Sequence, residues 1–146
     1  MSYDSDRAQD CAFILQVRMN VLQGSLKKWN RILQRITDKS MRVREGGTGD
    51  CPCCIEFYDN DCKGCPIKDY TGKRQCLDTP YVEWMKLREA KEHHYPYSED
   101  ATFTIQEPAE VVMFKRIAAK EVKFLEKVYN KERREADKVI KILQKY

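Results

Sequence analysis

Six of the seven cysteines of this chain crowd into one short stretch, and no other feature restricts its folding as much. Two Cys-x-x-Cys pairs stand inside that stretch, Cys51 to Cys54 and Cys62 to Cys65. Each pair can direct two thiolates at one metal ion, because the tight turn between the cysteines aims both sulfurs to the same side. Residues 51–78 otherwise hold mostly turn-forming and charged residues. We therefore predict that a bound metal supplies much of their folding free energy.

Zinc is the metal that we expect. A structural zinc ion takes four sulfur or nitrogen ligands, often from two such pairs. The candidate ligands are Cys51, Cys54, Cys62, Cys65 and Cys76. Cys53 lies inside the first pair, and we expect its side chain to point away from the metal. An iron–sulfur cluster, such as a 4Fe-4S cluster, is the alternative, because it also needs four thiolates and the ligand type alone does not separate the two metals.

A disulfide-linked knot is a less favoured interpretation of the same cysteines. Their total is odd, and the first residues lack the basic and then apolar pattern of a signal peptide. No apolar run approaches the length that crosses a bilayer. We therefore expect a cytoplasmic protein whose reduced thiols bind metal. Its 146 residues suit a single domain.

Two long stretches have the periodicity of amphipathic helices. In residues 6–39, apolar residues alternate at spacings of four and three, as in a coiled-coil heptad, and Ser5 or Asp6 is the expected N-cap. Residues 108–146 open on a proline and follow the same rule, and Glu132 is the one break in their apolar seam. Both seams predict core packing, or alternatively the contact surface of a homodimer.

Shorter elements are predicted between the two helices. Thr79 as N-cap, with a proline at the first helical position, opens a third helix over residues 79–92. Ile55–Tyr58 and Thr102–Ile105 are the candidate strands. Three glycines within residues 45–50 predict a flexible hinge.

The fold class that we predict is mainly α. Two long amphipathic helices form an antiparallel hairpin or a small bundle, with the cysteine-rich metal-binding module inserted between them and a short third helix beside them. Trp29 and Trp84 are expected in the core rather than on a base-stacking surface.

Charge is distributed unevenly, although the net charge is only +4. Residues 1–45 hold nine Lys and Arg against five Asp and Glu, residues 113–146 hold eleven against five, and the remainder holds seven against thirteen. Positive ends around an acidic centre indicate binding to a polyanion, or attraction between the ends and the centre. The candidate nucleic-acid-binding residues on the last helix are Lys120, Lys123, Lys127, Lys131, Arg134 and Lys138. A solvated charged face is the plainer interpretation of the same residues.

The motifs do not favour an enzyme. The sequence lacks a Ser/His/Asp set, a phosphate-binding loop and a dinucleotide fingerprint. Its two histidines, His93 and His94, are adjacent, so they cannot build the separate catalytic and metal-binding positions of an HNH nuclease. Alternatively, one of the two histidines replaces a cysteine as a zinc ligand. A metal-dependent enzyme would need an open coordination position at the cysteines.

The order of short motifs along residues 51–84 is distinctive. The motifs are Cys51-Pro52-Cys53-Cys54, Cys62-Lys63-Gly64-Cys65-Pro66-Ile67, Thr71-Gly72, Cys76 and Thr79-Pro80-Tyr81. Together they resemble a cysteine-rich module of bacteriophage and related mobile-element proteins, in which cysteines stand at the five candidate ligand positions and Cys53 is an addition. The resemblance covers less than a quarter of the chain. It implies metal binding in a viral setting, hence in the host cytoplasm, and it implies no activity.

These patterns together predict a helical interaction protein that is stapled by structural zinc and binds nucleic acid or a protein partner. The alternative is an iron–sulfur protein whose cluster has a redox or other cluster-dependent role. No membrane association is expected.

Overall fold

The computed structural model describes residues 3–36, 41–92, 102–105 and 107–145, and the protein is mainly helical there. The helices are α1 (Tyr3–Arg35), α2 (Pro52–Phe57), α3 (Pro66–Thr71), α4 (Pro80–Glu92) and α5 (Pro108–Leu143). The other described elements are the 3-10 helices η1 (Gly47–Gly49) and η2 (Tyr58–Asn60) and the strands β1 (Met41–Arg44) and β2 (Thr102–Ile105). One long N-terminal helix and one long C-terminal helix therefore dominate the molecule.

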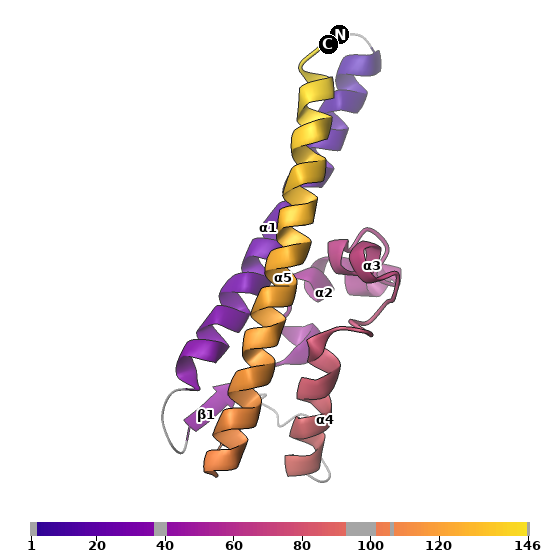
Figure 1. Ribbon diagram of the computed structural model, residues 1–146. Helices are drawn as coiled ribbons and strands as arrows, with labels where there is room; N and C mark the ends of the chain where they lie inside the picture. Colours follow the sequence, from indigo (N-terminus) through magenta and orange to yellow (C-terminus); the bar gives the residue numbers. More distant parts are fainter. Residues whose placement is uncertain (1–2, 37–40, 93–101, 106, 146) are drawn as a thin grey trace.

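The helices α1 and α5 lie side by side and run antiparallel, so that both chain ends are at the same end of the molecule (Figure 1). Apolar positions in the middle of both predicted seams enter one core. Its buried members include Leu22 and Trp29 of α1 and Ala118, Val122 and Leu125 of α5. Each helix thus covers the apolar face of the other within a single chain, as the core-packing interpretation requires.

The boundaries of α1 differ from the predicted ones. The helix begins at Tyr3, so Ser5 and Asp6 lie inside its first turns and neither is its N-cap. It ends at Arg35 rather than near residue 39, and the fully buried Ile36 follows it. Gly24, in the middle of the helix, closely approaches the cysteine segment, because a Cβ at this position would lie 2.8 Å from Cγ of Pro52.

The start of α5 at Pro108 confirms the predicted helix start. Glu107 is the N-cap, and its backbone N–H donates to Oε1 of Glu110 at 3.1 Å while its own side chain accepts from the backbone there, which makes a capping box. The break in the apolar seam is Glu132, which is buried and paired with Arg18 of α1. An ion pair between the two long helices therefore replaces an apolar contact at that level.

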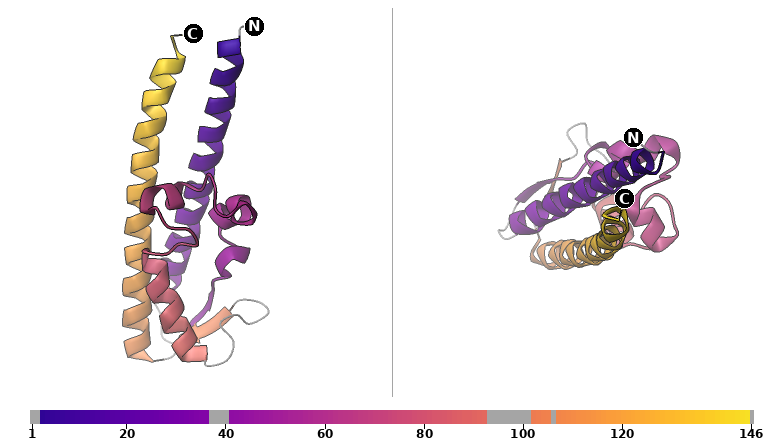
Figure 2. Two further views of the ribbon diagram at one scale, coloured as in Figure 1. Left: turned by 90° about the vertical axis from the view of Figure 1, so that its right-hand side faces the viewer. Right: turned by 90° about the horizontal axis from the view of Figure 1, so that it is seen from above.

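The strands β1 and β2 pair antiparallel, with Val43 opposite Phe103, at the end of the molecule away from both termini (Figure 2). The extended conformation predicted for Thr102–Ile105 is confirmed. The sequence does not predict β1, because two of its four residues are arginines and its alternation is too short to stand out. The register places the fully buried Val43 and Ile105 toward the core.

Aromatic side chains fill the core beside this sheet. The Trp84 ring of α4 meets Trp29, Phe103 and Phe114 edge to face, with centroid distances of 5.0, 5.8 and 5.0 Å. Such contacts contribute about 0.5–1.5 kcal/mol each beyond the burial of apolar area. Both tryptophans are buried, which confirms their predicted place in the core. We call this region, formed by β1, β2, α4 and the first half of α5, the aromatic end.

One short prediction inside the chain is wrong. Ile55–Tyr58 is not a strand, because Pro52 at the first helical position starts α2 directly after the extended Cys51. Residues 45–50 form a turn around η1, and their predicted flexibility stays a prediction. Their anchor is Glu45, which is fully buried.

Glu45 is held from several directions. Its carboxylate accepts hydrogen bonds from Nζ of Lys28 at 2.7 Å, from the hydroxyl of Tyr81 at 3.0 Å and from the backbone N–H of Gly47 at 2.8 Å. The guanidinium of Arg88 donates to the Glu45 carbonyl. Burial of a carboxylate is tolerated when it is paired and hydrogen-bonded in this way, so the turn is fixed to α1 and α4.

Within the described ranges, no helix is both long and apolar enough to cross a membrane.

The predicted start and end of the third helix are confirmed by α4, and Oγ1 of Thr79 accepts from the backbone N–H of Tyr81 at 3.3 Å. His93 and His94, the optional zinc ligands, lie outside the described residues.

Candidate metal centre and basic helix face

The cysteine segment, residues 51–78, lies against the middle of the α1 and α5 pair (Figure 2). Cys51 is the N-cap of α2 and Cys65 is the N-cap of α3, and a proline follows each of them at the first helical position. Cys53 and Cys54 lie in the first turn of α2, and Cys76 lies in the connection to α4. The prolines thus fix the direction in which the chain leaves two of the cysteines.

Five cysteine side chains are linked in a row. Hydrogen-bonding interactions with the neighbouring thiols Cys53 and Cys54 lower the pKa of Cys51. Cys53 interacts in the same way with Cys65, and Cys54 with Cys76. The order along the row is therefore Cys65, Cys53, Cys51, Cys54 and Cys76. We call these five side chains the sulfur row.

Ser25 of α1 supports the centre of the sulfur row. Its hydroxyl oxygen lies 3.4 Å from Sγ of Cys53 and 3.8 Å from Sγ of Cys51, and the side chain is buried. The cysteine segment is therefore in direct contact with the long N-terminal helix at the sulfurs themselves.

The sulfurs share protons unequally. Hydrogen bonds from Cys53 and Cys54, together with the charge of Lys28, hold the pKa of the Cys51 thiol far below its ordinary value, although burial opposes them. Hydrogen bonding to Cys51 raises the pKa of Cys53 and of Cys54. A hydrogen bond from Cys53 is the largest cause that lowers the pKa of Cys65 to about 7. A thiolate flanked by thiols is a group in which a metal cation can replace the shared protons.

The structure distinguishes among the predicted ligands. Cys51, Cys54, Cys65 and Cys76 belong to the sulfur row. Cys62 is also buried, but among the described residues no hydrogen bond connects it to another cysteine.

Cys53 was expected to point away from the metal, and that expectation stays a prediction. Its side chain lies in the first turn of α2, where it is 1% exposed and interacts with Cys51 and Cys65. The signal that could have placed it was Pro52, which predicts a helix rather than a loop at this pair.

The donor set of the sulfur row fits a thiophilic metal. Four or more sulfurs suit tetrahedral zinc or an iron–sulfur cluster, and they do not suit magnesium or calcium, which prefer oxygen ligands. Across the described ranges, no three Cys, His, Asp or Glu side chains already surround a single point as a bound ion requires. Gathering four sulfurs around one ion from a row therefore needs rotation of cysteine side chains.

The backbone of the cysteine segment is unusual at two of its turns. Five residues other than glycine have positive φ, namely Asp61, Cys62, Gln75, Cys76 and Asp78. A left-handed conformation costs a residue with a side chain about 1–2 kcal/mol. Such turns persist where the surroundings hold them, so this segment needs interactions beyond its own few apolar residues.

One arginine ties the second cysteine turn to both long helices. Arg18 of α1 donates to the carbonyl of Gly64 at 3.0 Å, to Asp69 of α3 at 2.7 Å and, through two nitrogens, to Glu132 of α5. The hydrogen bond to Glu132 is the largest cause that raises the pKa of Arg18, and burial opposes it. The turn is thereby fixed relative to the helical pair.

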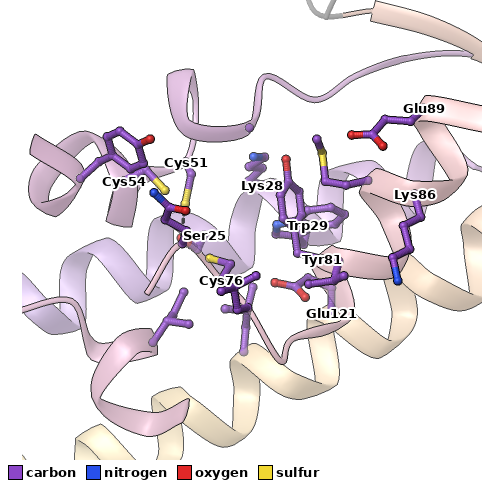
Figure 3. A pocket seen from close by; sticks show the side chains of 18 residues that line it. Ser25, Lys28, Trp29, Cys51, Cys54, Cys76, Tyr81, Lys86, Glu89 and Glu121 are labelled. Carbon is purple, nitrogen blue, oxygen red and sulfur yellow. Dashed lines mark hydrogen bonds between the residues drawn. The ribbon is translucent and has the colours of Figure 1, made fainter. Parts of the chain in front are cut away.

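A cavity of about 420 Å³ opens beside the sulfur row (Figure 3). Its lining includes Cys51, Cys54, Cys76, Lys28, Trp29, Tyr81, Met85 and Glu121. The walls therefore come from α1, the cysteine segment, α4 and α5, and they combine sulfur, aromatic and carboxylate groups.

The carboxyl group of Glu121 is the least satisfied polar group in the wall of this cavity. The residue is 4% exposed, and among the described residues its Oε2 atom has no hydrogen-bond partner. Burial first, and then the negative charge of Cys51, raise the pKa of Glu121 to about 8, although Lys28 and the backbone N–H of Tyr81 oppose the shift. The sequence signal for its position is its place on the apolar face of α5, next to Val122.

The six predicted nucleic-acid-binding residues share one face of α5. Their spacings are three, four, four, three and four residues, which at 3.6 residues per turn confines them to a sector of about 80°. All six are exposed. The acidic residues of α5 fall outside this sector, and two further cations, Arg116 and Lys141, fall inside it. We call these eight cations the basic stripe.

Two members of the basic stripe have partners on the protein. Nζ of Lys120 lies 3.5 Å from a carboxylate oxygen of Glu83, and both side chains are about half exposed. Lys131 lies over the ring of Tyr70, 5.4 Å from its centroid. Lys123, Lys127 and Arg134 have no ion pair with any residue that the structure describes, so their charges face solvent.

Comparison with known proteins gives no relatives: no family model matches the chain, and no curated protein or solved structure matches it.

Proposed function

We propose that this protein binds nucleic acid through the phosphate backbone, using the basic stripe of α5, and that a structural zinc ion in the sulfur row staples the inserted cysteine module to the helical pair. The observation that carries the proposal is the sector of α5 that holds eight cations and no acid. A merely solvated helix usually intersperses both signs of charge on its exposed face.

The dimensions of the basic stripe suit a regular polyanion. From Arg116 to Lys141 it extends about 38 Å, because each helical residue adds about 1.5 Å, and successive charges are about 5 Å apart. Duplex DNA presents one phosphate about every 3.4 Å along each strand. Contacts of this kind release counterions and do not read bases, so binding is strong at low salt and indifferent to sequence.

The zinc ion has a structural role in this proposal. Residues 51–54 contact α1 through Pro52 and Ser25, and the turn before α3 contacts both long helices through Arg18. An ion bound by cysteines from α2, from the start of α3 and from the connection to α4 would join these contacts into one unit. The module would then hold α1, α4 and α5 together behind the basic stripe.

The test compares two triple charge reversals. The stripe variant carries Lys123→Glu, Lys127→Glu and Arg134→Glu, which spares Lys120 and Lys131 and their contacts with protein side chains. The matched control carries Lys27→Glu, Arg31→Glu and Arg35→Glu on exposed positions of α1. Both variants change the net charge equally, so general electrostatic attraction falls equally in both.

The measurement is fluorescence anisotropy with a labelled 20-bp duplex and a labelled 20-nucleotide single strand, titrated at several salt concentrations. We expect the stripe variant to lose affinity by about 100-fold at low salt, and its log–log salt slope to fall by about three. The control triple should lose much less. Equal losses in both variants, or no binding by the natural protein at low salt, would contradict the proposal and would indicate a protein partner for α5.

An iron–sulfur cluster is the second candidate for the sulfur row. Two observations favour it: the row offers five sulfurs rather than four, and a cavity larger than a single ion needs lies beside it. Protein purified without oxygen would then be brown, with absorbance near 400 nm and bound iron. Colourless protein with zinc would exclude the cluster.

A further inference from the structure

The cavity beside the sulfur row has the features of a binding site for a small organic molecule. Its volume of about 420 Å³ falls within the usual range of ligand pockets, and four separate parts of the chain form its walls. Much of the lining is apolar, including Trp29, Val82, Met85 and Leu125. A site of this kind needs a few convergent polar groups to orient what it binds.

Glu121 supplies such a group. Its side chain lies at the cavity wall between Cys76 and Tyr81 (Figure 3), and its Oε2 atom lacks a partner among the described residues. A buried carboxyl oxygen without a hydrogen bond is unfavourable by about 1–3 kcal/mol, more if it is charged. A cationic donor brought by a ligand would remove that cost, and it would also favour the charged carboxylate over the protonated form that burial alone favours.

The other charges near the cavity decide the sign of the ligand. Nζ of Lys28 is already 2.7 Å from Glu45 and 2.7 Å from Asp50, so it is neutralised by the protein. Lys86 and Glu89, of opposite sign, also line the cavity, but both are exposed. Among the described residues, no salt bridge joins Glu121 to a cation. A cation is therefore favoured in the cavity and an anion is not.

The aromatic walls favour the same class of ligand. Trp29 and Tyr81 meet edge to face at 5.8 Å and both line the cavity. Aromatic rings attract ammonium groups and also cover apolar surface. A metal ion as occupant would leave the apolar part of the lining, including Val82 and Leu125, uncovered.

We infer that this cavity binds a small organic cation, a primary amine with an apolar body, whose ammonium group donates to Oε2 of Glu121 while its body lies against Trp29, Tyr81 and Met85. The inference rests on the proposed function only in so far as the metal-bound cysteine segment forms one wall of the cavity. It does not depend on nucleic-acid binding.

The test uses benzylamine as the probe and benzyl alcohol as its neutral match, titrated into the purified metal-containing protein by calorimetry. We expect benzylamine to bind with one site per chain, and benzyl alcohol to bind at least about ten times more weakly, since it cannot provide a cation. The variant Glu121→Gln should lose benzylamine affinity by about tenfold or more and retain its fold by circular dichroism.

A second variant protects the test against misfolding of the first. Met85→Trp places a larger side chain at the cavity wall on the half-buried side of α4, and it should block benzylamine without removing the carboxyl group. Equal affinity for both probes, unchanged benzylamine affinity in both variants, or no benzylamine binding at all would overturn the inference.

Zinc content measured on every sample separates this inference from the proposed function. Benzylamine binding by protein that carries no metal would leave the inference standing and defeat the zinc proposal. Loss of benzylamine binding in Glu121→Gln with zinc retained would show that the carboxyl group, and not the metal, holds the amine.

Discussion

The aromatic end and the cysteine segment are held together by different means. The aromatic end buries Trp84, Phe103, Ile105 and Phe114 at 5% exposure or less. The described cysteine segment buries Ile67 as its only large apolar side chain apart from cysteine and proline. Full burial of a large apolar side chain contributes about 1.5–3 kcal/mol, so apolar burial stabilises the first region far more than the second.

The backbone conformation also differs between the two regions. The aromatic end uses a regular helix and a paired strand, whereas the cysteine segment places Cys62 and Cys76 in left-handed conformations. A region with little apolar burial and costly turns folds only when another interaction supports it. The comparison indicates that sulfur–metal bonds would stabilise the cysteine segment, as aromatic packing stabilises the aromatic end.

Removal of the metal should give the largest difference between the two regions. Structural zinc contributes on the order of 10 kcal/mol of apparent folding free energy in small zinc modules. We expect a chelator to abolish amide hydrogen-exchange protection in residues 51–78 while the aromatic end keeps most of its protection. Mass spectrometry of peptic fragments with and without chelator measures this, and identical protection in both states would contradict it.

Trp84→Ala should destabilise the aromatic end and leave the metal content of the cysteine segment unchanged. The side chain is fully buried and contacts three other aromatic rings, so its truncation should lower the free energy of unfolding by about 3–5 kcal/mol. Denaturant unfolding gives this value, and Ile55→Ala at a 66% exposed position serves as the matched control. Zinc content should stay unchanged in both. A loss below about 1 kcal/mol for Trp84→Ala would mean that the aromatic end is not the main core.

Gly24→Ala tests the contact between the cysteine segment and α1. The added Cβ would lie 2.8 Å from Cγ of Pro52, so α2 must shift away, and we expect a loss of about 1–3 kcal/mol despite the better helix propensity of alanine. Ala12→Gly, at an exposed position of the same helix, is a control for propensity alone. An increase in stability for Gly24→Ala would show that α2 does not pack at this distance.

Serine substitutions of single cysteines should give the sharpest test of the sulfur row, because each variant changes one candidate ligand. Cys65→Ser should lower the bound zinc per chain, whereas Cys62→Ser should retain it, because Cys62 is outside the row. Cys11→Ser, on the exposed face of α1, is the control without effect. Metal analysis after gel filtration measures the zinc per chain of each variant. Loss of zinc in Cys62→Ser would mean that Cys62 is a ligand.

Periodicity and proline position predicted the larger elements correctly. The alternation of apolar residues indicated both long helices, and Pro80 and Pro108 marked the starts of α4 and α5, since these signals act within a few turns of chain. The start of α1 and the strand β1 were missed. The strand β1 depends on contacts with a distant part of the chain, the pairing of Val43 with Phe103, that a local pattern does not contain.

The candidate site was predictable in its chemistry and not in its geometry. Cysteine spacing indicated four members of the sulfur row, but the inward turn of Cys53 follows from the helix that begins at Pro52. Glu121 belongs to the cavity because α4 and the cysteine segment cover that point of α5, and sequence spacing alone does not show which segment covers it. The basic stripe was visible at helical spacing, since it lies on a single element.

Metal analysis of the protein as purified tests the central claim most directly. Elemental analysis combined with the visible absorption spectrum, on protein that has never met a chelator, should give about one zinc per chain in a colourless sample. The double variant Cys51→Ser with Cys54→Ser should contain none. Protein without bound metal, whose cysteines all react with a thiol reagent while the fold stays intact, would contradict the account.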